Sequence, residues 1–176
     1  VHSGDFTLAG GDMEALDFIE WLCDLPYKHK IFIAGNHDDC MLDASLEGLP
    51  KDVHYLSDSG ITIDGISFYG APMFVVFGGE ELKEVEHYEQ IPDNTDILIT
   101  HRPPLGIMDS IDDHIHYGSS ILLDKISNIK PKMHLFGHVH SAYGTMDWKG
   151  VTFSNAGLTD WKYDIQYSPQ LLEINI

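Results

Sequence analysis

Apolar residues recur along this chain at helical spacing in some segments and in short continuous runs in others. Residues 11–25 and 119–129 carry apolar side chains every three or four positions, and a proline closely follows each segment. This pattern predicts two amphipathic helices that end at these prolines. The strongly charged stretch 80–88 indicates an exposed helix or loop.

Short apolar runs bounded by polar and glycine-containing turns predict the strands. They are residues 31–34, 53–56, 61–63, 66–69, 96–100, 133–136, 145–148, 151–154 and 171–176. Asp64-Gly65 and Lys149-Gly150 are typical of tight turns, so the strands around them are expected to form hairpins. The first part of the chain alternates predicted strands and helices, and the later part contains predicted hairpins. This mixture predicts an α/β sandwich with mixed sheets.

Composition and charge narrow the class of protein. The chain has 176 residues, of which 43% are hydrophobic, which suits one domain spanning residues 1–176. It has 28 acidic against 10 basic residues and a formal net charge of −18, so it repels nucleic acid and anionic membranes at long range. No apolar run approaches the roughly 20 residues of a membrane span.

Two features bear on the compartment and on the start of the chain. The cysteines, Cys23 and Cys40, do not form a CxxC pair, so we expect a reducing, cytoplasmic location. The chain starts at Val1 rather than Met, and the step from Val1 to Gly4-Asp5 is typical of the end of a strand. We therefore expect an N-terminally truncated domain.

Four apolar runs are each followed at once by residues that can bind a metal ion. These segments are Gly4-Asp5, Gly35-Asn36-His37-Asp38, Thr100-His101 and Gly137-His138-Val139-His140. Taken alone, each has an ordinary explanation as a turn or a surface histidine. On an extended backbone the two histidines of the last segment would lie on the same side. Because ligands of α/β folds bind beyond the carboxyl ends of strands, the combination indicates one metal site built from Asp, Asn and His.

These segments resemble the motifs of the calcineurin-like metallophosphoesterase superfamily, in the small branch that contains the metallophosphoesterase-domain proteins. The matching stretches are residues 2–7, 33–38, 95–101, 103–106, 132–140 and 154–156. The resemblance implies a four-layer α/β/β/α sandwich of two mixed sheets, here without its first strand. It also implies two divalent metal ions at the edge of the sheets, with Mn favoured over Fe, Zn, Co or Ni.

The resemblance also implies roles for particular residues. Asp5 matches the carboxylate that bridges both ions. Asn36, His101 and His138 match further ligands of the second ion, and His140 matches a ligand of the first ion.

One departure from the superfamily concerns the first ion. In the superfamily, an Asp-x-His motif that precedes the Gly-Asp motif supplies ligands of the first ion. This motif has no counterpart here, so only Asp5 and His140 remain for that ion. We expect the second site to bind its ion and the first to be weak or empty, so that the chain holds one ion rather than two.

The expected activity is hydrolysis of a phosphodiester or phosphomonoester by metal-bound hydroxide. By resemblance, His37 faces the phosphate and the leaving group. Arg102 suits a phosphate contact, although a surface role is an equal alternative. His116 is expected to line the active site by resemblance, with a solvated polar loop as the alternative.

The partner is expected to be a small phosphoester, and the resemblance favours a cyclic nucleotide. The net charge of −18 and the lack of a stripe of Lys and Arg disfavour a nuclease. A second hypothesis is a catalytically impaired, metal-binding regulatory or interaction module, which the missing motif favours.

Overall fold

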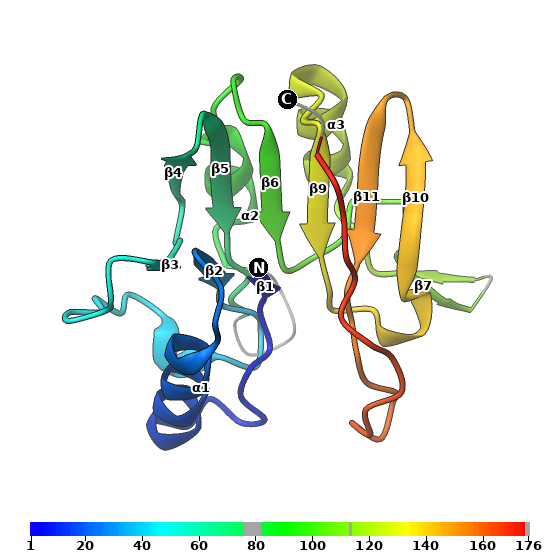
Figure 1. The fold of residues 1–176 in the computed structure, drawn as a ribbon. Helices are drawn as coiled ribbons and strands as arrows, with labels where there is room; N and C mark the ends of the chain where they lie inside the picture. The colour runs from blue at the N-terminus through cyan, green and yellow to red at the C-terminus, as the bar shows by residue number, and fades with distance from the viewer. Residues whose placement is uncertain (76–81, 113, 175–176) are drawn as a thin grey trace.

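Helices and strands alternate through most of the chain in the computed structural model, which describes residues 1–75, 82–112 and 114–174 (Figure 1). The α-helices are α1 (Asp12–Asp24), α2 (Glu84–Glu89) and α3 (Ser120–Ile129). Two short 3-10 helices are η1 (Asp39–Met41) and η2 (His140–Ala142). The predicted helices 11–25 and 119–129 are confirmed, and part of 80–88 forms α2, with residues 80 and 81 outside the described ranges.

The larger sheet has six strands in the order β10-β11-β9-β6-β5-β4. Their bounds are β4 (Ser59–Ile63), β5 (Ile66–Ala71), β6 (Ile97–Thr100), β9 (Met133–Phe136), β10 (Gly144–Trp148) and β11 (Val151–Asn155). The central pairs are parallel, whereas β4–β5 and β10–β11 are antiparallel hairpins. Both predicted turns, Asp64-Gly65 and Lys149-Gly150, have positive φ at both residues, as a type I′ hairpin turn requires.

The smaller sheet has the order β1-β2-β3, with β1 (His2–Ser3), β2 (Lys30–Ile33) and β3 (Val53–Tyr55). Both of its strand pairs are parallel, so the expectation of mixed strands holds for the larger sheet and not for this one. A separate small hairpin joins β7 (Ser110–Asp112) to β8 (Ile115–His116).

The layers follow from the alternation of side chains along β2. Phe32 lies in a core cluster with Leu22 of α1, on the outer face of the smaller sheet. Its neighbour Ile33 points the other way and packs with Ile99 of β6, between the two sheets. On the far face of the larger sheet, Leu122 of α3 lies in a third cluster. The order is therefore α1, smaller sheet, larger sheet, then α2 and α3, which confirms the four-layer expectation.

The C-terminal segment corrects one predicted strand. Residues 171–174 are not a strand, and residues 175 and 176 lie outside the described part of the chain. Leu172 and Ile174 instead pack against the cluster between the sheets, where the segment passes in front of β9 in Figure 1. The alternating apolar residues therefore cover a sheet face rather than extend a sheet edge.

No helix in the described ranges is both long enough and apolar enough to cross a membrane. The strands β1, β2, β6 and β9 end on the same side of the two sheets, where the predicted polar segments follow them.

Candidate metal centre

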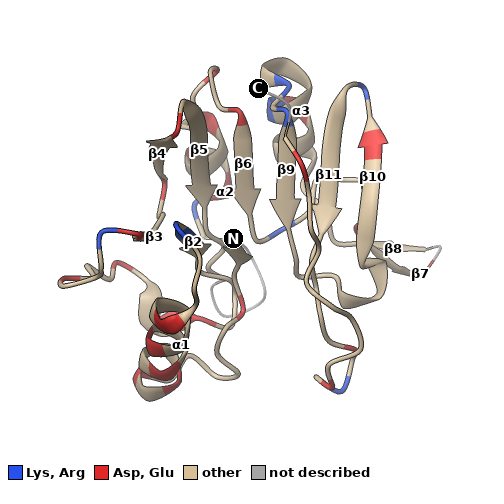
Figure 2. Ribbon diagram, in the orientation of Figure 1, with Lys and Arg blue, Asp and Glu red and all other residues tan. Residues whose placement is uncertain are grey.

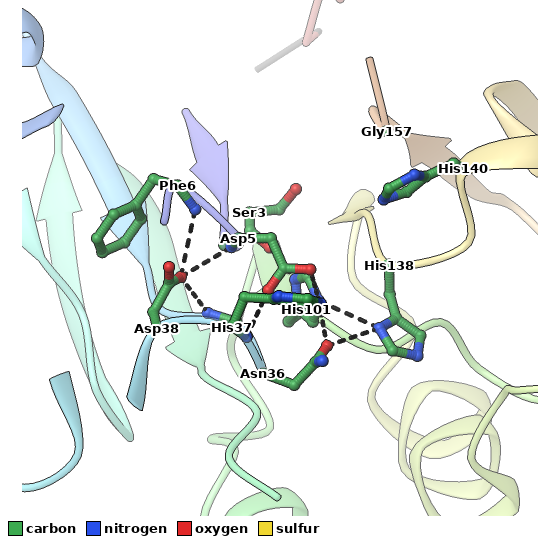
Figure 3. Close-up of polar contacts among 12 residues, drawn as sticks. Ser3, Asp5, Phe6, Asn36, His37, Asp38, His101, His138, His140 and Gly157 are labelled. Atoms are coloured by element: carbon green, nitrogen blue, oxygen red, sulfur yellow. Dashed lines mark hydrogen bonds and ion pairs between the residues drawn. The ribbon is translucent and has the colours of Figure 1, made fainter. Parts of the chain in front are cut away.

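Four side chains from four strand ends bring their donor atoms together (Figure 3). The Oδ1 atom of Asn36 lies 3.0 Å from Nε2 of His101 and 2.8 Å from Nδ1 of His138. The two histidine nitrogens are 3.2 Å apart. Oδ2 of Asp5 lies 3.1 Å from Nε2 of His101. Segments as far apart in sequence as Asp5 and His138 therefore meet at one point, as the sequence predicts.

These separations fit the ligands of one divalent ion. Neighbouring donors lie about 2.9 Å apart on an octahedral ion, and about 3.4 Å apart on a tetrahedral one, with bonds of about 2.0–2.1 Å. Within the described residues, Asp5, His101 and His138 are the one group of three histidine, cysteine or acidic side chains placed to hold an ion. The other ring nitrogen of His101 donates to the Ser3 carbonyl at 2.8 Å, which turns Nε2 with its lone pair toward the site.

The electrostatics of the cluster also suit a cation. Burial raises the pKa of Asp5, but a protonated His101 and the backbone N–H of His37 outweigh it, so this pKa lies well below its ordinary value. Burial lowers the pKa of His101, but Asp5 outweighs it and raises that pKa, so a metal ion would take the place of the proton on Nε2. Burial, together with the nearby His101, lowers the pKa of His138 to about 3. At neutral pH Asp5 is therefore ionised and His138 neutral, which are the states in which these side chains bind metal ions.

His140 does not join this cluster. His138 adopts a left-handed conformation with φ of 67°, so the backbone here is not extended, and the argument that an extended backbone places both histidines on one side does not apply. His140 begins η2, and its Nδ1 donates to the Asp160 carbonyl at 3.0 Å. Figure 3 shows its ring apart from the side chains joined by dashed lines.

Asp38 organises the centre, although the sequence analysis assigned it no role. Its buried carboxylate accepts from the backbone N–H groups of Gly35 at 2.7 Å, Asp5 at 2.8 Å and Thr7 at 2.9 Å. The Thr7 hydroxyl donates to it as well, at 2.9 Å. The one sequence signal for this role was the position of Asp38 directly after Asn36-His37, where an Asp side chain can accept hydrogen bonds from backbone N–H groups of the turn.

Gly35 allows the two loops to approach each other. A Cβ atom there would lie 2.6 Å from the Asp5 nitrogen and 2.7 Å from Cε1 of His101. Asp5 and His101 both belong to the candidate metal centre, so any residue larger than glycine at position 35 would displace their side chains.

Asn155, at the end of β11, supports the turn that carries the two histidines. Its fully buried amide donates to the Val139 carbonyl at 2.9 Å and accepts from the Gly157 N–H at 3.0 Å. This contact ties β11 to the segment between His138 and His140.

His37 lies at the rim of the centre. Its backbone N–H donates to Oδ1 of Asp5 at 2.9 Å, and its Nδ1 donates to the Leu8 carbonyl at 2.8 Å. This arrangement leaves Nε2 as the ring nitrogen available to a ligand.

The two candidate substrate contacts both have protein partners. Nε of Arg102 donates to the Tyr117 carbonyl at 2.7 Å, and its Nη1 lies 3.4 Å from a Glu84 oxygen. Nδ1 of His116 lies 2.9 Å from the buried carboxylate of Asp109. Their substrate contacts stay predictions.

Comparison with known proteins points to one family. Residues 1–142 match the family model described as calcineurin-like phosphoesterase. The chain is 33% identical to the UPF0046 protein K07C11.7 of Caenorhabditis elegans over 96% of this chain and 65% of that protein. It is 32% identical to metallophosphoesterase domain-containing protein 1 of Homo sapiens over 99% of this chain and 64% of that protein. The chain thus spans a little under two thirds of the length of these relatives.

A solved structure supports the fold. The crystal structure of phosphopantetheinyl hydrolase from Mycobacterium tuberculosis aligns with a TM-score of 0.53 and 14% identity. The alignment covers 88% of this chain and 76% of that one.

Proposed function

The chain belongs to the calcineurin-like phosphoesterase family, and we propose that it hydrolyses a phosphoester at a divalent metal ion. The proposed ligands are the four side chains whose donor atoms converge, namely Asp5, Asn36, His101 and His138. This convergence is the observation that carries the proposal, because it provides oxygen and nitrogen donors at separations that one ion can span.

The donor set has no thiolate, which suits Mn, Fe, Zn, Co or Ni, and we take Mn as the first metal to test. When bound, such an ion polarises a phosphoryl oxygen and makes a coordinated water more acidic. Asp5 contributes its ionised carboxylate, and His101 is oriented by its bond to the Ser3 carbonyl.

We assign His37 to the leaving group. Its Nδ1–H is held by the Leu8 carbonyl, so a protonated ring would present its second N–H, on Nε2, to the departing oxygen. The backbone bond from His37 to Asp5 keeps this ring next to the metal centre. A positioned acid of this kind contributes about 10²–10⁴-fold to the rate.

The proposed substrate is a small phosphoester, either a diester such as a cyclic nucleotide or a monoester. The net charge of −18 opposes binding of a polyanionic nucleic acid. Figure 2 shows acidic residues gathered on α1 and the Lys and Arg of the described residues scattered rather than aligned in a stripe. Charge at the substrate phosphate is therefore to be balanced by the ion itself.

A second candidate function is a metal-binding regulatory or interaction module with little catalysis. The position of His140 favours it, because this histidine lies outside the cluster of donor atoms. Such a module would bind one ion without turning over substrate.

One experiment separates the two functions. The chain is reconstituted with Mn, its metal content is measured by mass spectrometry, and p-nitrophenol release is followed from bis(p-nitrophenyl) phosphate and p-nitrophenyl phosphate. We expect at least one ion per chain and turnover that falls by about 10²–10⁴-fold in His37→Asn at unchanged metal content. The exposed His114→Asn serves as the matched control. Bound metal without turnover supports the module, whereas undiminished turnover in His37→Asn contradicts the role of His37.

We also propose the cytoplasm as the compartment. Cys23 and Cys40 are both free thiols in the structure, which suits a reducing environment. Fractionation of cells that express the full-length protein tests this location.

A further inference from the structure

The loop that follows β11 is held in a closed shape by its own backbone. Thr159 and Ile165 form an antiparallel bridge, and the Leu158 carbonyl accepts from the backbone N–H groups of Gln166 and Tyr167 at 2.9 and 3.1 Å. Asp160 closes the tip, since its side chain accepts from the N–H groups of Lys162 at 2.8 Å and Asp164 at 3.1 Å. Figure 1 shows this loop beyond the carboxyl end of β11, on the side where the candidate metal centre lies.

The loop is anchored to the site through His140. Nδ1 of His140 bonds to the Asp160 carbonyl at 3.0 Å and lies 3.2 Å from the Thr159 hydroxyl. The histidine at the end of the fourth motif therefore positions this loop rather than entering the four-residue donor cluster.

Tyr163 is the point where the loop meets both halves of the site. Its ring lies edge-on to His140, with centroids 5.8 Å apart, and edge-on to His37, with centroids 6.1 Å apart. His37 follows a strand of the smaller sheet and His140 follows a strand of the larger one. The tyrosine thus spans the gap between the ends of the two sheets.

The backbone at Tyr163 is strained. Its φ is 65°, a left-handed conformation that a bulky residue rarely adopts and that is found disproportionately at ligand-binding sites. The Tyr163 N–H donates to the Asp160 carbonyl at 3.0 Å, which holds this conformation in place. Tyr163 as a whole is still 53% exposed, which leaves room for a ligand beside it.

We propose that Tyr163 is a substrate-contact residue whose ring receives a planar, aromatic ring carried by the leaving group of the phosphoester. The inference rests on the proposed function, which assigns His37 to the departing oxygen. Because Tyr163 contacts His37 directly, the organic group attached to that oxygen lies beside the tyrosine ring. Offset stacking or edge contact between the two rings then favours esters whose leaving group carries an aryl or heteroaryl ring over simple alkyl esters.

Two phosphonates that cannot be hydrolysed at an ester bond test this preference by binding alone. Phenylphosphonate and methylphosphonate share the group that binds the metal centre and differ in the ring. On the Mn-loaded chain we expect phenylphosphonate to bind about 3–10-fold more tightly, the fold-change that an aromatic contact supplies. Binding is measured by calorimetry.

Variants of the loop test whether the preference for phenylphosphonate is due to the Tyr163 ring. Tyr163→Gly removes the ring and suits the left-handed backbone, so the loop keeps its shape, and we expect the two affinities to become equal. Tyr163→Phe should retain the preference. Trp161→Gly is the matched control, because Trp161 lies in the same loop, is 81% exposed and has its ring beside Nζ of Lys162, 4.9 Å from the ring centroid.

The outcomes distinguish this inference from the proposed function. If methylphosphonate does not bind the Mn-loaded chain, the phosphoester site itself is contradicted, and the role of Tyr163 falls with it. If methylphosphonate binds but phenylphosphonate binds no better, or if its preference persists in Tyr163→Gly, only the role of Tyr163 is overturned.

Discussion

The side chain of Asp38 accepts a hydrogen bond from the backbone N–H of Asp5 at 2.8 Å, across 33 positions of sequence. The carboxylate proposed to bind the ion is therefore held in place by a second carboxylate that contributes no ligand atom. The same buried side chain also accepts from Gly35, so it fixes the loops after β1 and β2 relative to each other. Buried networks of this kind are sensitive to the loss of one member.

Asp38→Asn should weaken metal binding. An amide at this position directs N–H donors at the backbone N–H groups of Gly35 or Thr7, so at least one bond becomes a clash. We expect Mn affinity to fall about 10–100-fold. We also expect the free energy of unfolding to fall by about 1–3 kcal/mol. Metal titration and urea unfolding measure the two effects. Asp39→Asn, an exposed neighbour, is the control and should change neither.

Gly35→Ala should disrupt the centre by steric overlap. The added methyl group would lie 2.6 Å from the Asp5 nitrogen and 2.7 Å from a His101 carbon, and neither can move without shifting a ligand. We expect at least a tenfold loss of Mn affinity, of the order seen when supporting contacts of a metal site are lost.

Gly11→Ala provides the comparison for this variant, because its Cβ would meet the Glu14 side chain at an ordinary distance of 3.5 Å. Calorimetric titration with Mn compares the two variants. Wild-type affinity in Gly35→Ala would show that the loops can separate without loss of the site.

Addition of metal should stabilise the chain through His138 and not through His140. A ligand at about 100 times its Kd stabilises the folded state by about 2.7 kcal/mol. We expect Mn to raise the melting temperature of the wild type, and chelation to reverse the rise. His138→Ala should abolish this shift because it removes a member of the donor cluster.

His140→Ala should retain the metal-dependent shift, because His140 lies outside the cluster of donor atoms. Differential scanning fluorimetry with and without Mn tests both variants. Loss of the shift in His140→Ala would place this histidine among the ligands of the ion.

The buried His134 should make the fold acid-sensitive. Burial lowers its pKa to about 3 from the ordinary value of 6.5. The unfolded chain therefore binds a proton at this residue below about pH 6.5, and the folded chain does so only near pH 3. The free energy of unfolding accordingly falls as the pH decreases through this window, by about 1.4 kcal/mol per pH unit from this one group.

His134→Gln should reduce that slope. Nε2 of His134 lies 2.8 Å from the Thr100 hydroxyl, a contact that a glutamine amide can replace. Urea unfolding between pH 6 and pH 4 measures the slope, with the exposed His114→Gln as control. An unchanged slope in His134→Gln would show that other groups cause the acid sensitivity.

Local signals were sufficient for most of the helices and strands. The spacing of apolar residues and the following prolines predict α1 and α3, and Asp64-Gly65 predicts the β4–β5 hairpin. These features depend on neighbours within a few residues, so the sequence contains the information directly. The order of polar residues after apolar runs also predicts that the four segments come together, because the carboxyl ends of parallel strands meet. The choice of Asp5, Asn36, His101 and His138 within them came from the family resemblance.

Long-range contacts decided the rest. In the sequence Asp38 has only the signature of a turn, and its bond to Asp5 depends on the fold. The positive φ at His138 could not be predicted from the spacing of the two histidines. Leu172 and Ile174 have the alternation of a strand but cover a sheet face that the chain has formed elsewhere. Tyr163 has no sequence signal, since its place beside His37 depends on a loop closed 126 positions further along the chain. Spacing specifies local conformation, whereas the packing of distant segments determines which side chains share a site.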